Sequence, residues 1–168
     1  MTTSMTRKMK ITMNSIKNYF SLIVKSIANI PQAITHYENE LEQAKKEVGL
    51  YGRLEKAAST LPGIVEQRFG QLQEIEAVLN HLNRELRKLR TKHYKKYLEN
   101  YQRALSSRDV EKYVDGEDDV CNFEEIINEW ALLRNKWLGI LKGLDQKQWQ
   151  ITNITKLRVA GMEDADVR

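Results

Sequence analysis

The sequence predicts an all-α protein, namely an elongated helical bundle that contains a long coiled-coil-like hairpin and is oligomeric. Three observations favour this fold class. The 168 residues include only two prolines and eight glycines, so the chain has few of the turn residues that β-rich proteins need. Strong helix formers such as Leu, Glu, Lys, Gln and Arg are abundant. Apolar residues recur at intervals of three and four along most of the chain, as in amphipathic helices.

The composition limits the class of protein further. A chain of this length with 41% hydrophobic residues fits one domain with a modest core. Cys121 is the single cysteine, which excludes an intramolecular disulfide and makes a reducing cytoplasm the simplest setting. The apolar run Leu22-Ile23-Val24 is cut short by Lys25, so we expect neither a signal peptide nor a membrane span.

Charge is segregated along the chain. Residues 1–31 carry five positive and no negative charges, residues 63–105 carry nine positive and five negative charges, and residues 106–129 carry two positive and nine negative charges. Such blocks favour electrostatic contact with a polyanion, with partner subunits, or with both.

Two helices are predicted in residues 1–62, the basic and amphipathic N-terminal region. The first begins near Asn14 or Ser15, either of which can cap it, and its apolar stripe is Ile16, Phe20, Ile23, Ile27 and Ile30. Pro31 fits the first turn of the second helix, whose stripe is Ile34, Tyr37, Leu41, Ala44 and Val48. Gly49 and Gly52 weaken this helix toward its end. A membrane-surface role for the first helix is an alternative, but its pattern also suits a helix at the edge of a bundle.

Residues 63–168 are predicted to form the hairpin, in one cooperative domain with the N-terminal region. A turn is expected at residues 59–63, before a central helix over residues 63–105. Its seam is Phe69, Leu72, Ile75, Leu79, Leu82, Leu86 and Leu89. Beyond Leu89 the packing face rotates, as at a stutter, from the seam positions His93, Lys96 and Asn100 to Tyr94, Tyr97, Leu98, Tyr101 and Leu105.

The second arm of the hairpin is predicted over residues 122–159. A short capped helix at Ser107 and an acidic turn at residues 115–119 precede it, and Asn122 and Glu125 have the spacing of a capping box. Its apolar stripe is too wide for one neighbouring helix. We therefore assign six of its residues to oligomerisation: Trp130, Leu133, Trp137, Ile140, Leu144 and Ile151. An exposed stacking surface is the alternative for the tryptophans, but their heptad spacing favours a core or a subunit interface.

No motif indicates catalysis. The sequence has no Gly-rich phosphate loop, no paired-cysteine or His-Glu-x-x-His motif and no nucleophile elbow, and its three histidines are scattered. We expect a non-enzymatic protein without a metal or cofactor. Asp115, Glu117 and Asp119 alternate as in a calcium loop, but the glycine and glutamate of an EF-hand are out of place, so an acidic linker is favoured.

A basic and aromatic segment is the best candidate for a binding site. It comprises Arg84, Arg87, Lys88, Arg90, Lys92, Tyr94, Lys95, Lys96, Tyr97, Tyr101 and Arg103. Cationic side chains attract phosphates, and tyrosine rings can stack on unpaired bases, so the segment predicts binding of single-stranded DNA. The alternative is a solvated helix face whose tyrosines pack against a neighbouring helix.

The order of features from Lys92 to Met162 resembles the UvsY recombination mediator family of tailed phages. The basic segment ends in Lys92-His93-Tyr94-Lys95-Lys96-Tyr97, and the polar turn Ser106-Ser107-Arg108 follows. Then come the acidic stretch Asp115-Gly116-Glu117-Asp118-Asp119-Val120 and the tail Ile151-Thr152-Asn153-Ile154-Thr155-Lys156-Leu157-Arg158 before Ala160-Gly161-Met162. The similar region covers less than half of the chain.

The resemblance implies a function. It implies a homo-oligomer such as a ring that binds single-stranded DNA, contacts a RecA-like recombinase and a single-strand-binding protein, and helps to load the recombinase in the cytoplasm of an infected bacterial host. It places DNA contacts at Lys88, Arg90, Lys92, Lys95 and Lys96 and assembly at the C-terminal helix. The first half of the chain departs from the family, because its N-terminal region is longer and more basic and its seam more regular. A phage virion or assembly protein without a nucleic-acid function is the alternative.

Overall fold

The molecule is an elongated assembly of helices. The computed structural model describes residues 19–100 and 105–162, and within these ranges every regular element is a helix, which confirms the all-α prediction. The elements are α2 (Tyr19–Lys25), the 3-10 turn η1 (Ile27–Asn29), α3 (Ile30–Val48), α4 (Leu54–Asn100), α5 (Ser107–Asp115) and α6 (Asp118–Val159). None of these helices is long and apolar enough to cross a membrane.

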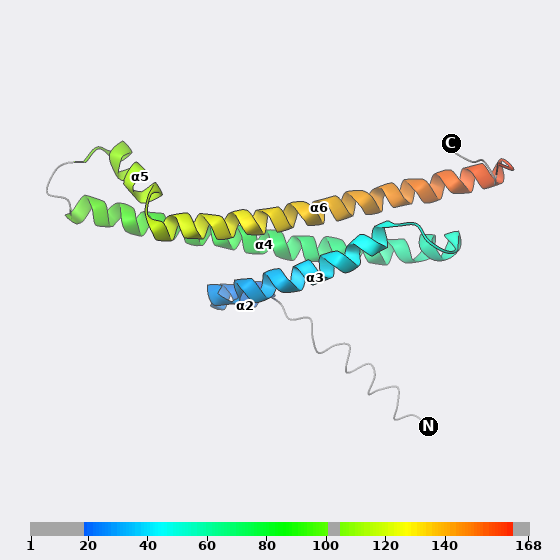
Figure 1. Cartoon of the computed structure of the whole chain (residues 1–168), viewed down its shortest axis with the longest axis horizontal. Helices are drawn as coiled ribbons and strands as arrows, with labels where there is room; N and C mark the ends of the chain where they lie inside the picture. Colours follow the sequence, from blue (N-terminus) through cyan, green and yellow to red (C-terminus); the bar gives the residue numbers. More distant parts are fainter. Residues whose placement is uncertain (1–18, 101–104, 163–168) are drawn as a thin grey trace, which may run out of the picture.

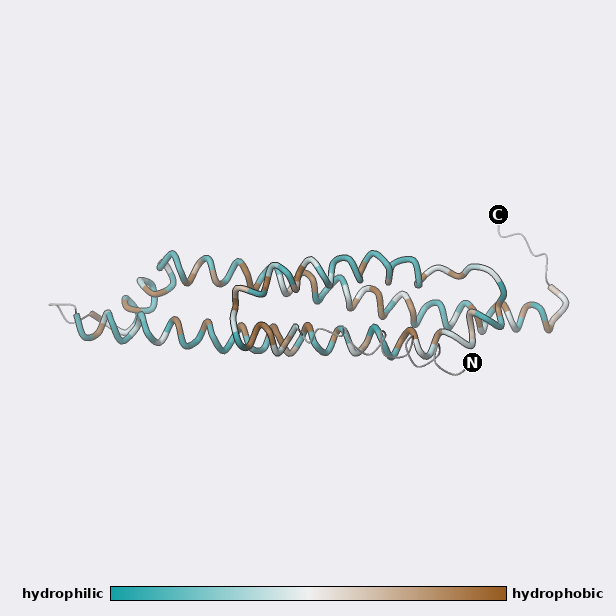
Figure 2. Tube along the Cα trace, turned by 90° about the horizontal axis from the view of Figure 1, so that it is seen from below, coloured by the Kyte–Doolittle hydropathy of each residue, from teal (hydrophilic) through white to brown (hydrophobic). Residues whose placement is uncertain are grey.

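The two longest helices, α4 and α6, run antiparallel beside each other along the molecule (Figure 1). Helices α2 and α3 lie against this pair but leave its α5 end uncovered (Figure 1). Hydrophilic residues predominate at that uncovered end, whereas hydrophobic residues gather where the helices lie side by side (Figure 2). The molecule therefore has a thicker part with a third layer and a thinner tip that carries α5.

The N-terminal helices follow the predicted stripes with one break. Helix α2 ends at Lys25, and Ser26 is extended, so one continuous helix to Ile30 is wrong. The Asn29 side-chain amide holds this break, because it donates hydrogen bonds to the carbonyl oxygens of Leu22 (2.9 Å) and Ser26 (3.1 Å). Pro31 lies in the first turn of α3, as predicted. The predicted start at Asn14 or Ser15 lies outside the described residues.

The turn predicted at residues 59–63 is wrong. Helix α4 begins at Leu54 and continues through Pro62. The real turn lies after Gly49, where Gly52 adopts a positive φ of 73°, a conformation that glycine reaches without a Cβ penalty. Burial of Ala57 and Leu61 shows why tertiary packing overrides the helix-breaking tendency of Pro62, whose own side chain is exposed.

The core lies where three layers of helix meet. Trp130 and Trp137 of α6 are completely buried and contact the ring of Tyr37 of α3 edge-on, with centroids 6.0 and 6.5 Å apart. The Trp130 indole N–H donates a 2.8 Å hydrogen bond to the carbonyl oxygen of Ile75 in α4. Trp130 is therefore held by both neighbouring helices.

The seam of α4 differs from the prediction at one position. Phe69 is 53% exposed, and the buried position beside it belongs to Arg68, which is 2% exposed. Its guanidinium donates to both carboxylate oxygens of Glu47 (2.6 and 2.7 Å) and to Glu40 (2.8 Å). Because these acids neutralise its charge, an arginine can occupy a seam position between Leu61 and Leu72.

The α5 end also departs from the prediction in part. Ser106 caps α5, since its side chain accepts a hydrogen bond from the backbone N–H of Asp109, which confirms the short capped helix. The capping box at Asn122 is wrong, because α6 begins at Asp118 with Glu117 as its N-cap residue. Asp118 and Asp119 in the first turn suit the positive end of the helix dipole.

Candidate nucleic-acid interface

The cations of the distal half of α4 occupy one side of the helix. At 100° per residue, five of them lie within an arc of roughly 120°, and we call this set the basic face: Arg84, Lys88, Lys92, Lys95 and Lys96. All five side chains are exposed. The buried Leu82 and His93 and the half-buried Leu86 and Leu89 lie outside this arc, at about 140° to 200° from Arg84. The packing of α4 therefore directs the basic face to solvent.

Most of the basic face is not neutralised within the chain. Among the described residues, no ion pair joins Arg84, Lys92, Lys95 or Lys96 to a carboxylate. Lys88 pairs with Glu85 at 2.7 Å, and this hydrogen bond lowers the pKa of Glu85. Such an exposed pair contributes little free energy, so Lys88 can exchange it for another anion.

The remaining cations of the predicted DNA site are arranged differently. Arg87 is exposed but lies at the edge of the basic face, and its Nε donates to the carbonyl oxygen of Asn83. Arg90 turns away and pairs with Asp115 of α5 and with Glu124 of α6. Arg90 thus holds the thin end of the molecule together. Tyr101 and Arg103 lie outside the described residues.

The tyrosines do not interleave with the cations on one surface. Tyr97 is half-buried, its hydroxyl donates a 2.7 Å hydrogen bond to Glu117, and its ring stacks on Tyr113 of α5 with centroids 5.6 Å apart. Tyr94 is half-buried and lines a shallow pocket with Val114 of α5. Both rings lie on the α5 side of α4. Tyr94 and Tyr97 therefore do not lie with the lysines on one open surface, which base stacking beside the cations would need.

The residues assigned to oligomerisation lie mainly inside the single chain. Five of them are buried against α3 and α4 without any partner subunit: Trp130, Leu133, Trp137, Ile140 and Leu144. Ile151 is half-buried and packs against the same core. The wide apolar stripe of α6 is thus explained by two neighbouring helices of its own chain, which corrects the subunit interface expected from the sequence.

A second cluster of chemically active side chains lies where α5 turns into α6. His93 of α4 is 9% exposed, and its Nε2 lies 2.8 Å from Oδ2 of Asp119 while its Nδ1 lies 3.5 Å from Oε1 of Glu117. The hydrogen bond with His93 lowers the pKa of Asp119 below its ordinary value of 3.8. Sequence reasoning missed this cluster, although the seam register already placed His93 on the buried side.

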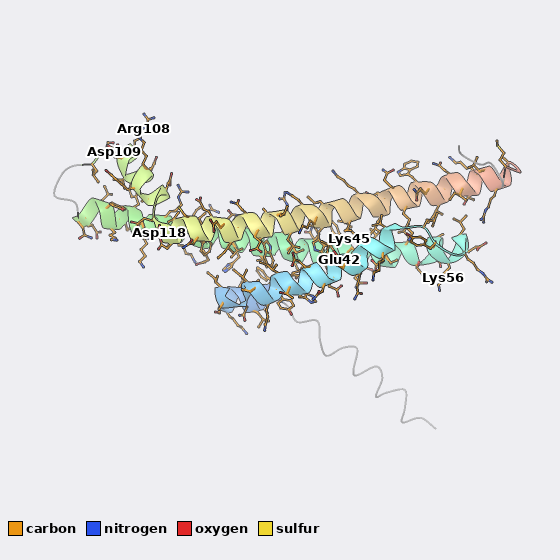
Figure 3. The ribbon with its side chains drawn as sticks, viewed as in Figure 1. Glu42, Lys45, Lys56, Arg108, Asp109 and Asp118 are labelled. Carbon is orange, nitrogen blue, oxygen red and sulfur yellow. The ribbon has the colours of Figure 1, made fainter. Side chains whose placement is uncertain are left out.

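The α5 end of the molecule carries charges of both signs. Figure 3 shows Arg108 and Asp109 on α5 and Asp118 where α6 begins, with Lys56 at the opposite end of the molecule.

Comparisons of this chain with protein-family models, with curated proteins and with solved structures gave no match.

Proposed function

We propose that this chain binds single-stranded DNA through the basic face of α4 and acts as a recombination mediator that helps to load a RecA-like recombinase onto DNA coated by single-strand-binding protein. The observation that carries the DNA-binding part is the basic face itself, with five exposed cations on one side of a rigid helix. The mediator role and the protein partners rest on the resemblance to UvsY-type proteins.

Electrostatics favours this binding mode. From Arg84 to Lys96 the basic face extends about 18 Å along the helix axis, and two carboxylates, Glu85 and Glu99, lie in the same arc. The excess of positive charge attracts a phosphate backbone and releases its condensed counterions. Since the rings of Tyr94 and Tyr97 pack toward α5, base stacking has no part in the proposal. Affinity should then depend on salt and little on base identity.

Self-association would add to the affinity. A single subunit offers only a few phosphate contacts, and several linked subunits raise the effective concentration for each later contact. Because the apolar stripe of α6 is buried within its own chain, self-association would use other surfaces. Apolar side chains are exposed at and just after the C-terminal end of α6, namely Leu157, Val159 and Met162.

The decisive experiment is a titration of labelled oligo-dT at several salt concentrations. Three to five phosphate contacts per subunit predict a slope of log affinity against log salt of about −2 to −3.5. Lys92→Ala combined with Lys95→Ala should make the slope less negative by about 1.4, because two phosphate contacts are lost. The matched control is Lys45→Ala with Lys46→Ala on α3, where both lysines are also exposed, and it should leave the titration unchanged.

The results also separate a second candidate function. The exposed apolar end of α6 favours a virion or assembly protein that packs against further copies without binding DNA. The oligomer mass of such a protein would change with protein concentration, but the protein would show no saturable binding of oligo-dT. An unchanged affinity in the Lys92 and Lys95 variant would refute the assignment of the basic face.

A further inference from the structure

We propose that His93, Glu117 and Asp119 form a binding site for a divalent transition-metal ion, with zinc as the best-suited ion. Each of the three residues offers one ligand atom, and these atoms lie within 4.8 Å of one another. They come from three parts of the chain: α4, the turn before α6, and the first turn of α6. An ion bound here would join all three.

The carboxylates that face both nitrogens of the His93 imidazole favour a bound cation. A neutral imidazole donates from only one of its nitrogens, yet both nitrogens of His93 face a carboxylate oxygen. Nδ1 is buried and has no hydrogen-bond partner. One nitrogen lone pair therefore faces an anionic oxygen in the neutral state. A bound metal ion removes this repulsion.

Local charge favours a doubly positive ion. Four carboxylates lie within residues 115–119, and Arg90 pairs with the first of them, Asp115. Glu117 and Asp119, which face the imidazole, have no paired lysine or arginine among the described residues. The combination of one imidazole and two carboxylates suits zinc, whereas calcium and magnesium prefer oxygen ligands alone.

Coordination of one ion requires one carboxylate to change its rotamer. Zinc binds nitrogen and oxygen ligands at about 2.0–2.2 Å, so its ligand atoms lie roughly 3–3.5 Å apart. Because Nδ1 faces Glu117 whereas Nε2 faces Asp119, one of the two carboxylates must rotate toward the nitrogen that the other already faces. Asp119 is exposed and Glu117 is half-buried, so the Asp119 side chain has the space to make this change of rotamer. The Tyr97 hydroxyl already donates to Glu117. Such a hydrogen bond orients a metal-binding carboxylate from outside the coordination sphere, which makes Tyr97 a positioning residue.

The test uses the full chain after removal of metal with a chelator. Zinc should raise the thermal unfolding temperature in a saturable way, and cobalt substituted for zinc should give the optical absorption of a coordinated ion. His93→Gln should abolish both effects. Tyr97→Phe should weaken zinc affinity about 10- to 100-fold, as expected for loss of an outer partner of a ligand. The matched control is His36→Gln, since His36 lies on α3 outside the cluster.

Each other outcome contradicts the site. If zinc leaves the unfolding temperature unchanged, the cluster does not bind zinc. If His93→Gln responds as the native chain does, zinc binds elsewhere. An equal response to magnesium or calcium would indicate a purely carboxylate surface site. If His93→Gln fails to fold, Asp119→Asn replaces it, because Asp119 is exposed, and it must also lose the response. DNA binding is measured separately, so failure here does not bear on the basic face.

Discussion

Replacement of Arg68 by methionine should destabilise the fold by about 3 kcal/mol. Methionine keeps an unbranched side chain in the core but removes the charge that Glu40 and Glu47 require. The native guanidinium makes three hydrogen bonds to these carboxylates, one to Gln71, and a cation–π contact 5.8 Å from the ring centroid of Trp137.

The magnitude follows from the exposure of the partners. Breaking a fully buried ion pair costs about 3–5 kcal/mol, because a charge is left without a partner. The side chains of Glu40 and Glu47 are 25% and 28% exposed, so water can reach them in the variant, and the lower end of that range applies. For a chain of this size, a loss of about 3 kcal/mol lowers the melting temperature by roughly 6–12 °C.

Urea denaturation followed by circular dichroism measures this loss. Adding Glu40→Gln and Glu47→Gln to the Arg68→Met variant removes the stranded charges, and this triple variant should recover about 1–2 kcal/mol. A loss below about 1 kcal/mol in the single variant would refute the reasoning, since it would mean that the ion cluster behaves as a surface pair. The absence of any recovery in the triple variant would refute it as well.

Two further results should follow from the core. Trp137→Ala should lower the free energy of unfolding by about 3–5 kcal/mol, because Trp137 is buried within its own chain. The same urea denaturation measures this loss. Native stability together with an altered oligomer mass would instead place Trp137 at a subunit contact. Burial tends to raise the pKa of Glu40, but hydrogen bonds from Gln71 and Arg68 outweigh it and hold the pKa below 4.5. The stabilisation from Glu40 is therefore present above that value and lost as the pH falls through the folded-state pKa, so the urea midpoint should fall in acid, and less so in Glu40→Gln.

Periodicity in the sequence predicted the helices and most of the core because the burial pattern of a helix is local. Ile23, Tyr37, Leu72 and Trp137 all lie on predicted stripes and are buried. Arg68 could not be found in this way. A charged residue counts as a break in an apolar pattern, and its partners Glu40 and Glu47 come from a different helix.

Helix boundaries were less predictable because they depend on tertiary contacts. Pro62 is an expected helix breaker, yet α4 passes through it since Leu61 is buried beside it. The predicted rotation of the packing face of α4 is right only in part. Tyr94 and Tyr97 are half-buried as predicted, but His93 also remains buried and Leu98 is 54% exposed. The contacts of His93 with residues at the start of α6 explain the difference.

The candidate DNA site shows the same limit of sequence reasoning. The number and spacing of the cations could be read from the chain, and five of them do share one side of α4. The direction of the tyrosine rings could not be read, because it depends on α5, which folds back beside them. The cluster of His93, Glu117 and Asp119 likewise combines a residue of α4 with residues at the start of α6, which are distant in the sequence.

The uneven thickness of the molecule has a consequence for its motions. The main hydrophobic cluster extends along α4 only as far as Leu82, and beyond it the α5 end is held by small buried valines, Val110, Val114 and Val120, and by polar contacts. Segments with few buried apolar contacts open at a lower free energy than the core. Amide hydrogens near α5 should therefore exchange with solvent through local opening, whereas those near Ile75 and Trp137 should exchange only when the whole chain unfolds. A ligand that binds at the α5 end would slow hydrogen exchange there and leave exchange in the core nearly unchanged.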